Sequence, residues 1–387
     1  MEKILHFVKD NKYIDWFIDV ISQYFQNDRH TFVFITNNTG VSFNNIRKNA
    51  NRIIIIGENQ VINFLIKNDY KIIILHGLPS IPYTLLTQIP KGIIVVWKAW
   101  GYDIYTQPKD YYRPLIPIKN LYRKKTKKIL YPTYKARIRR LKKVIRGLLH
   151  KKAFENSIKR IDYFSGVIAP EYNLMKQYNS FFHAKQTSFG YFSLEQLKPS
   201  DENELSVNGD NILIGNSGDP TNNHLDAFEI VKKVNIGNRK IYSFLSYGGT
   251  EDYRKKVIAE GKKIWGNNFI PITEFLSFDD FNKIIADCGN VIYFHERQQA
   301  GGNINQALSI GCKVFLSDTS CFYNHKKKLG YTIFNIFKDF NEKELAKPLD
   351  VQIKRKNHDI LEGYKYQRLV VLKDFFDKMN EEATNTI

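Results

Sequence analysis

Two stretches of the sequence place residue types that bind phosphate directly after an apolar run. In the first, NILIGNSGDPTNNH (residues 211–224), the apolar run ends at Gly215 and small or hydrogen-bonding side chains follow. Glycine permits a sharp turn, and a helix predicted to begin near Asn222 offers N–H groups at its positive end. This loop suits a diphosphate, but an ordinary strand-to-helix turn uses the same residue types. The residues assigned to the ligand are Gly215, Asn216, Ser217, Gly218 and Asp219.

The second stretch, residues 293–318, combines a cation with amides and glycines. A guanidinium suits a phosphate, and amides donate and accept hydrogen bonds to sugar hydroxyls. A surface loop without a ligand is the alternative, but the crowding of amides and glycines favours a binding site. The predicted contacts are Arg297, Gln298, Gln299, Gly302 and Asn303, the last of which is expected to cap a short helix. The SYGG loop (246–249) is expected near the same diphosphate through Ser246, Tyr247 and Gly248.

A third group of candidate residues lies in the first half of the chain, in VVWKAWGYDIY (95–105). Trp97 and Trp100 offer flat apolar faces to a sugar ring, and Asp103 offers a carboxylate just past a strand. Tryptophans packed in a core and an aspartate that caps a helix are the alternatives. His76, at the end of the preceding strand, and Asp10 are further ionisable residues in this half.

Strand-like runs alternate with helical patterns along nearly the whole chain. Continuous β-branched runs such as RIIIIG (52–57) and KIIILHG (71–77) are typical of parallel strands that are buried on both faces. The fold class is therefore α/β, with two Rossmann-like, doubly wound parallel sheets facing across a cleft and ligands at the C-terminal ends of the strands. The expected division is a first domain over 1–192, a linker over 193–210, a second domain over 211–358, and a helix over 359–387 that can return to the first domain.

Composition excludes several classes of protein. The 387 residues are 43% hydrophobic, which argues against general disorder, and the three cysteines are scattered without a C-x-x-C pair. No apolar run approaches the roughly 20 residues of a spanning helix, and the start of the sequence does not resemble a signal peptide. The net charge of +19 favours a polyanionic partner such as nucleic acid, anionic lipid or a phosphorylated ligand.

The positive charge is concentrated between Lys119 and Lys152, where 15 Lys or Arg residues occur without Asp or Glu. Apolar residues at positions 134, 138, 141, 145 and 148 share one helical face, which predicts a cationic amphipathic helix on an anionic membrane surface. Packing of the stripe on the protein's own core, a solvated face and nucleic-acid binding are the alternatives. Too few tyrosines are interleaved to favour nucleic acid. The predicted membrane contacts are Lys135, Arg139, Arg140, Lys142, Lys143 and Arg146.

In outline, the second half of the chain resembles the nucleotide-sugar end of GT-B glycosyltransferases. Many retaining members carry an E-x7-E pair, and Gln298 and Gln306 have that spacing here, so amides replace both acids. The segments GNSGDPTNNH, RQQAGG and WKAWGYDIY resemble those of the TDP-N-acetylfucosamine:lipid II N-acetylfucosaminyltransferases of enterobacterial common antigen assembly. The resemblance runs from about residue 1 to 320 and includes the ILHF opening, HG at 76–77, and the segment from LSYGG to EDY.

The resemblance implies a peripheral enzyme on the cytoplasmic face of the inner membrane. It would transfer an amino-deoxy sugar from a dTDP-sugar to a saccharide linked to undecaprenyl diphosphate, with the donor on the second domain and the acceptor on the first. Another GT-B transferase of O-antigen or capsule assembly, a nucleic-acid-binding protein and an inactive GT-B-like scaffold are the alternatives. A dehydrogenase is disfavoured because HFVKDNKYID lacks the glycine fingerprint.

The expected chemistry needs no metal or other cofactor. A D-x-D motif at a strand end is missing from the sequence, and Asp279 and Asp280 fall at a predicted helix start. The leaving diphosphate is therefore expected to be stabilised by Arg297 and a helix N-terminus. If the reaction inverts the anomeric centre, a base must deprotonate the acceptor hydroxyl, and Asp103, His76 and Asp10 are the candidates in that order. If the reaction retains it, no such base is required.

Overall fold

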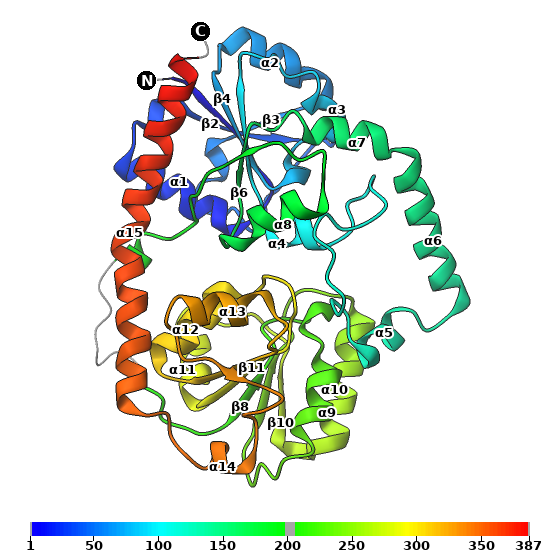
Figure 1. The fold of residues 1–387 in the computed structure, drawn as a ribbon, viewed down its shortest axis with the longest axis vertical. Coiled ribbons are helices and arrows are strands. Elements are labelled where there is room, and N and C mark those ends of the chain that lie inside the picture. The colour runs from blue at the N-terminus through cyan, green and yellow to red at the C-terminus, as the bar shows by residue number, and fades with distance from the viewer. Residues whose placement is uncertain (1, 198–205, 386–387) are drawn as a thin grey trace. The chain divides into compact units, whose positions relative to one another are not determined.

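The computed structural model describes residues 2–197 and 206–385, which form two α/β units (Figure 1). The first unit contains residues 2–117, 141–197 and 365–385, and the second contains 118–140 and 206–364. The predicted linker, 193–210, lies partly outside the described residues.

The first unit is built on a parallel sheet of seven strands in the order β3-β2-β1-β4-β5-β6-β7. The order reverses between β1 and β4, so a crevice is expected where these two strands end. The strands are β1 Ile4–Phe7, β2 His30–Ile35, β3 Ile53–Ile56, β4 Ile72–His76, β5 Ile94–Lys98, β6 Tyr163–Ser165 and β7 Lys185–Gln186.

The second unit is built on a parallel sheet of six strands in the order β10-β9-β8-β11-β12-β13, and its order reverses between β8 and β11. Its strands are short and mostly apolar, as the hydrophobic runs predicted, although β11 and β12 begin with Asn290 and Lys313. They are β8 Ile212–Ile214, β9 Ile241–Phe244, β10 Phe269–Ile272, β11 Asn290–Tyr293, β12 Lys313–Leu316 and β13 Phe334–Asn335. Two doubly wound parallel sheets confirm the predicted α/β class.

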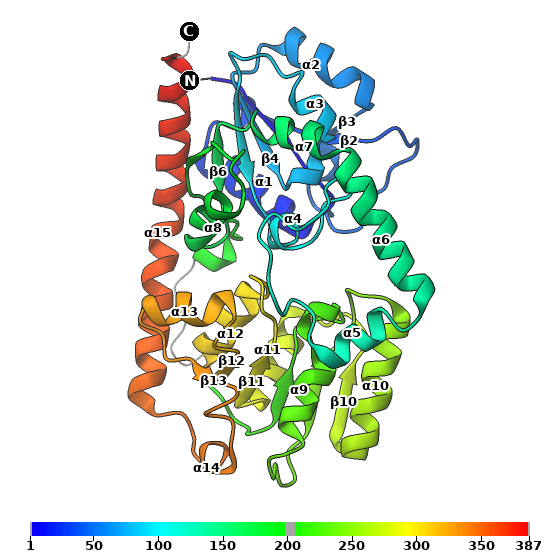
Figure 2. The same cartoon turned by 45° about the vertical axis from the view of Figure 1, so that its right-hand side comes forward.

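Helices connect successive strands and cover the sheets (Figures 1 and 2). In the first unit these are α1 Lys12–Tyr24, α2 Val61–Asn68, α3 Tyr83–Leu86, α4 Gly101–Tyr105, α7 Lys151–Ile158 and α8 Pro170–Tyr178. In the second unit they are α5 Lys124–Leu130, α9 His224–Val231, α10 Glu251–Trp265, α11 Phe278–Asp287, α12 Gly301–Ile310, α13 Cys321–Lys328 and α14 Glu342–Leu345. Two helices, α6 Tyr134–Leu149 and α15 Val351–Thr384, contain residues of both units.

The C-terminal part of α15 packs in the core of the first unit. Leu372, Phe375, Phe376 and Met379 join a buried cluster with residues of β1 and of α1, including Phe17. One face of the sheet is thus covered by α1 and by the end of α15. The burial of large apolar side chains explains why the last helix is so long.

The structure corrects one domain boundary. Residues 118–140 were predicted within the first domain, but they belong to the second unit because their backbone is bound there. Asp226 of α9 accepts hydrogen bonds from the N–H groups of Lys125 (2.9 Å) and Thr126 (2.9 Å). These bonds place Asp226 at the N-terminus of α5, where a carboxylate is favoured.

A single glycine fixes where α6 packs. A Cβ at Gly147 would lie 2.3 Å from the backbone carbon of Tyr111, so the helix approaches that segment backbone to backbone. Nearby, Arg146 bonds Asp110 at 3.0 Å, and Lys143 donates to the carbonyl of Gln107 at 3.0 Å.

We expect Gly147→Ala to lower the free energy of unfolding by about 1–3 kcal/mol, because the added methyl group must displace backbone atoms. Chemical denaturation followed by circular dichroism measures this change. Gly363→Ala in α15 is the matched control, since a Cβ there meets no atom within 4 Å, and it should stabilise by up to about 1 kcal/mol through helix propensity. Equal effects of the two substitutions would contradict the packing of α6 on residues 111–112.

Candidate active site

The loops that follow β8 and β11 are joined at the reversal point of the second sheet. Gln299, after β11, donates from Nε2 to Oδ1 of Asn216 at 3.1 Å and accepts from the hydroxyl of Thr221. Asn216, Gln299 and the neighbouring Gln298 are each less than a tenth exposed. Because Gln299 and Asn216 bond each other, their first role is to hold the two loops in register.

The loop after β9 joins the same group. The N–H of Gly218 donates to the carbonyl of Tyr247 at 2.7 Å. Gly215 has φ of +78°, which confirms the sharp turn predicted at the end of β8. Gly218 was assigned to the ligand, and the protein's own packing already requires a glycine there: a Cβ would lie 2.7 Å from the side chain of Arg254 and 2.9 Å from the carbonyl oxygen of Gly248.

The helix start predicted near Asn222 is a 3-10 turn, Pro220–Asn222, and α9 itself begins at His224. Asp219 caps the turn by accepting from the N–H of Thr221 at 2.9 Å. Asn223, directly before α9, accepts from the N–H of Arg123 at 2.8 Å. This end of α9 is therefore covered by the protein's own chain, which argues against a diphosphate at its N-terminus.

The start of α12 is more open. It begins at Gly301, so Asn303 lies inside the first turn and does not cap it, contrary to prediction. A Cβ at Gly302 would meet no atom within 4 Å. The first N–H groups of an α-helix have no partner within the helix. They therefore carry a partial positive charge that suits an anion.

Arg297 lies between β11 and α12 and is partly exposed. One of its guanidinium nitrogens donates to the carbonyl of Gln298 at 3.0 Å. Tyr122 lies close enough to feel the charges of Arg297 and Asp219: its pKa is raised to about 12, first by burial and then by Asp219, while Arg297 opposes the change. Arg297, Asp219 and Tyr122 therefore share one electrostatic environment.

The structure adds a buried ion pair that the sequence interpretation missed. Glu296, with 1% of its side chain exposed, pairs with Arg123, which also donates to Ser317 at 3.1 Å. The other carboxylate oxygen accepts from the hydroxyl of Thr319 at 2.7 Å. The ring of Phe294 lies 4.1 Å from the guanidinium of Arg123. The available signal was an acid directly before Arg297, but its partner lies 173 residues away, at the beginning of the basic stretch 119–152.

In the first unit, Asp103 is buried and works as a helix cap, the alternative considered from the sequence. Its Oδ2 accepts from the N–H of Leu78 (2.9 Å), the N–H of Trp100 (3.1 Å) and the indole of Trp97 (3.2 Å). Burial raises the pKa of Asp103 to about 7, against the opposing effect of these bonds. Trp97 is fully buried, so the prediction that it contacts an acceptor is corrected.

The other two predicted bases are also occupied. Asp10 accepts the N–H groups of Asn44, Asn45 and Ile46 at 2.8–2.9 Å, and these bonds hold its pKa below the usual value although burial opposes them. His76 is fully buried and bonds the hydroxyl of Tyr191 at 2.6 Å. The indole of Trp100 donates to the same hydroxyl at 3.1 Å. Asp103 and His76 are therefore buried, whereas Asp10 is partly exposed with its carboxylate bonded to backbone N–H groups. Tyr191, which bonds His76, is also partly exposed.

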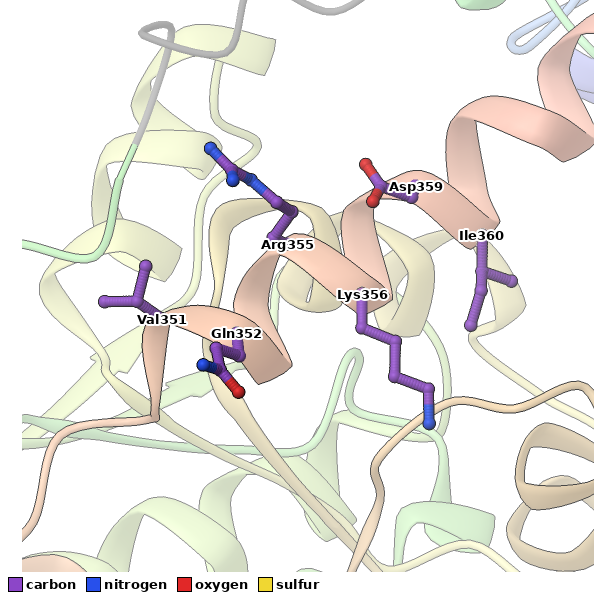
Figure 3. Close-up of a pocket in the computed structure, with 6 residues that line it drawn as sticks. All are labelled: Val351, Gln352, Arg355, Lys356, Asp359 and Ile360. Carbon is purple, nitrogen blue, oxygen red and sulfur yellow. The ribbon is translucent and has the colours of Figure 1, made fainter.

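A surface hollow of about 400 Å³ lies elsewhere, along the first turns of α15 (Figure 3). It is lined by Val351, Gln352, Arg355, Lys356, Asp359 and Ile360. All of these come from one helix, and none belongs to the loops after β8, β9 or β11. Among the described residues, no group of three His, Cys, Asp or Glu side chains is arranged to hold a metal ion.

The fold is that of the GT-B glycosyltransferases. Sucrose-phosphate synthase from Thermosynechococcus elongatus matches with a TM-score of 0.63 at 9% identity, covering 100% of both chains. HepE from Anabaena, solved with UDP and glucose, matches at 0.59 and 13% identity, covering 100% of this chain and 99% of that one. A glycosyltransferase from Rickettsia africae matches at 0.57 and 12% identity, covering 98% of each chain. At such identities the likeness shows the fold.

The sequence match is more specific than the structural ones. Residues 171–358 match the family model described as 4-alpha-L-fucosyltransferase, glycosyl transferase group 56. This match agrees with the resemblance to fucosaminyltransferases seen in the motifs. The protein is an enzyme, a glycosyltransferase.

We expect Arg123→Ala to lower the free energy of unfolding of the second unit by about 3–5 kcal/mol, because Glu296 is left as a buried, unpaired charge. The double variant Arg123→Ala with Glu296→Gln should recover much of this loss. Urea denaturation of the single and double variants measures both effects. Lys125→Ala is the control, since its 3.4 Å pair with Glu229 is exposed and contributes at most about 1 kcal/mol. An Arg123→Ala loss no larger than that of the control would contradict the pairing.

Proposed function

We propose that the enzyme transfers an amino-deoxy sugar, of the 4-acetamido-4,6-dideoxy-galactose type, from a dTDP-sugar to a saccharide linked to undecaprenyl diphosphate. The observation that carries the proposal is the match of residues 171–358 to a fucosyltransferase family, together with the motifs in that region. The proposed place of work is the cytoplasmic face of the inner membrane.

The proposed diphosphate site is the start of α12 beside Arg297. Support comes from the open space at Gly302 and from the position of both groups after β11, at the reversal point of the sheet. The helix N-terminus and the guanidinium would stabilise the charge that develops on the leaving diphosphate. In this proposal no metal is required.

The proposed surface for the nucleobase is a pair of exposed aromatic rings. Tyr247 and Phe275 stack with their centroids 5.8 Å apart and an interplanar angle of 14°, and Phe275 is 78% exposed. The hydroxyl of Tyr247 lies 3.4 Å from Nδ2 of Asn216, so the rings adjoin the loop after β8. Flat π faces stack favourably on bases.

The proposed membrane contact is α6. Leu141, Ile145 and Leu148 are each about half exposed, and Leu149 is 80% exposed, so the apolar stripe is not buried in the protein's own core. All six predicted basic contacts are exposed on the same helix. Among the described residues, no helix is long and apolar enough to cross a bilayer. An exposed apolar stripe flanked by cations suits the interface of an anionic bilayer.

A thermal-shift screen with dTDP, UDP, GDP and CMP tests the donor. We expect dTDP to raise the melting temperature most, because a ligand that binds only the folded state stabilises it by mass action. Arg297→Ala should remove most of the shift while leaving the unliganded melting temperature nearly unchanged. Arg355→Ala, a change of an exposed arginine on α15, is the control and should keep the shift.

A larger shift with UDP would instead support another nucleotide-sugar transferase of O-antigen or capsule assembly. If none of the four nucleotides raises the melting temperature, the proposed donor site is contradicted.

Co-sedimentation with lipid vesicles tests the role of α6. We expect binding to vesicles with 30% phosphatidylglycerol that is at least about tenfold weaker for Lys135→Glu/Arg139→Glu/Lys142→Glu, because each basic residue near an anionic leaflet contributes up to about 1 kcal/mol. The control Lys256→Glu/Lys262→Glu/Lys263→Glu makes the same charge change on α10. Equal losses for the two triple variants would show a general charge effect and contradict the proposal.

A further inference from the structure

Three histidines form a continuous hydrogen-bonded chain through the core of the first unit. His6 on β1 bonds His76, the last residue of β4, with Nδ1 and Nε2 2.9 Å apart. The other ring nitrogen of His6 lies 2.9 Å from Nδ1 of His30, the first residue of β2. His76 continues the chain to the hydroxyl of Tyr191 at 2.6 Å. The chain thus leads from the C-terminal edge of the sheet to its opposite edge.

These imidazoles stand on a sheet whose strands are mostly apolar, with Lys98 of β5 in register beside His76. His6 and His76 are fully buried, and the face that carries them is covered by Phe17 of α1 at ring distances of 5.6 and 5.1 Å. Burying a polar side chain costs about 1–3 kcal/mol unless it is hydrogen-bonded. Apolar residues would pack this face without that requirement, so packing alone does not account for three linked imidazoles.

Only one direction of the hydrogen bonds lets the chain carry a proton inward from Tyr191. An indole N–H can only donate, so Trp100 donates to the oxygen of Tyr191, which keeps a second lone pair and its own O–H. Inward transfer requires this O–H to donate to Nδ1 of His76, which then carries its proton on Nε2. In the same direction His76 donates to Nδ1 of His6, and His6 donates from Nε2 to His30.

The surroundings keep all three rings neutral, as a directed chain requires. Burial lowers the pKa of His6 well below its ordinary value, and its two histidine neighbours act in the same direction. The pKa of His76 is lowered to about 3 by burial and by Lys98. The pKa of His30 is lowered to about 4 by burial, Arg29 and Arg52, against the opposing charge of Asp28.

We propose that Tyr191, His76, His6 and His30 form a proton relay that removes the proton of the acceptor hydroxyl. The O–H bond of the acceptor breaks as its proton binds the oxygen of Tyr191, whose own proton moves to Nδ1 of His76. The Nε2 proton of His76 moves to His6, that of His6 moves to His30, and that of His30 leaves to water. The acceptor oxygen is left with the electron pair that attacks the sugar, and the diphosphate leaves with the donor's bond electrons.

The relay rests on the proposed glycosyl transfer and deepens it. Tyr191 is partly exposed and stacks on Tyr13, which is 37% exposed, at a centroid distance of 5.9 Å. These rings, with Trp100, stand at the C-terminal edge of the first sheet, where its order reverses. Tyr191 is the residue that meets the hydroxyl, and the three histidines act through it.

The substitution His6→Gln distinguishes a role of His6 in proton transfer from a purely structural role. A glutamine amide can still accept from His76 and donate to His30, but it does not pass a proton on. We expect kcat to fall at least tenfold, with KM for the nucleotide sugar changed less than twofold and the melting temperature nearly unchanged. Phe32→Leu is the control: Phe32 stacks on His6 at 4.5 Å but carries no proton, so kcat should stay within twofold. A wild-type kcat for His6→Gln would overturn the relay.

A spectroscopic measurement is independent of the substrate. Long-range ¹H–¹⁵N spectra of the full-length protein, assigned with single His→Gln variants, should show these three imidazoles neutral and protonated at Nε2 at pH 7. An Nδ1–H tautomer at His6 or His76 would overturn the chain. If the tautomers are as expected but the wild-type protein transfers no sugar from any nucleotide donor, the proposed function fails while the hydrogen-bonded chain stands.

Discussion

A buried carboxylate that needs a cation organises the second half of this enzyme. Glu296 follows the central strand β11, and its charge is compensated by Arg123 from a distant part of the chain. The same connection brings residues 121–126 over the end of α9, through Asn223 and Asp226. The ion pair thereby helps to hold residues 121–126 over the N-terminus of α9, whereas the N-terminus of α12 stays uncovered by this segment.

The open end is that of α12, where we propose that the leaving diphosphate binds. Because parallel strands all end at the same edge of a sheet, the loops that follow β8, β9 and β11 lie close together. Hydrogen bonds among Asn216, Thr221 and Gln299 then fix these loops before any ligand arrives. In a preorganised site of this kind, little reorganisation free energy is required when negative charge develops on the leaving group.

The two sheets differ in which polar side chains they bury. The strands of the second sheet bury Ser243, Asn290, Lys313 and Asn335 but carry no histidine, whereas the strands of the first bury His6, His76 and Lys98. Lys98 is held by Ser165 at 3.2 Å and by the carbonyl of Gly166 at 2.7 Å. Binding of a donor needs only loops at a strand edge, but moving a proton through a core needs side chains within it.

Much of the fold was predictable because its signals are local. β-Branched runs located strands such as β3 and β4 to within a residue or two, and the glycine at 215 marked a turn that the structure confirms. The site was less predictable because its decisive contacts are not local. Arg123 pairs with Glu296, and His76 bonds Tyr191, which is 115 residues away in the sequence. Residues so far apart form no periodic pattern, so the sequence alone does not reveal these contacts.

Two roles assigned from residue type also changed once burial was known. Trp97 suits a sugar platform by chemistry, yet it lies wholly in the core and donates to Asp103. Gly218 suits a close approach to phosphate, yet the space beside it is filled by Arg254. The residue type determines which interactions a side chain can make, but the packing around it determines which partners it contacts.

A crystal structure of the enzyme with a bound nucleoside diphosphate tests most directly whether α12 and Arg297 form the donor site. We predict that the diphosphate oxygens lie within hydrogen-bonding distance of the first N–H groups of α12 and of the guanidinium of Arg297. A nucleotide bound away from the loops after β8 and β11, for example beside Tyr191 and Trp100, would contradict it.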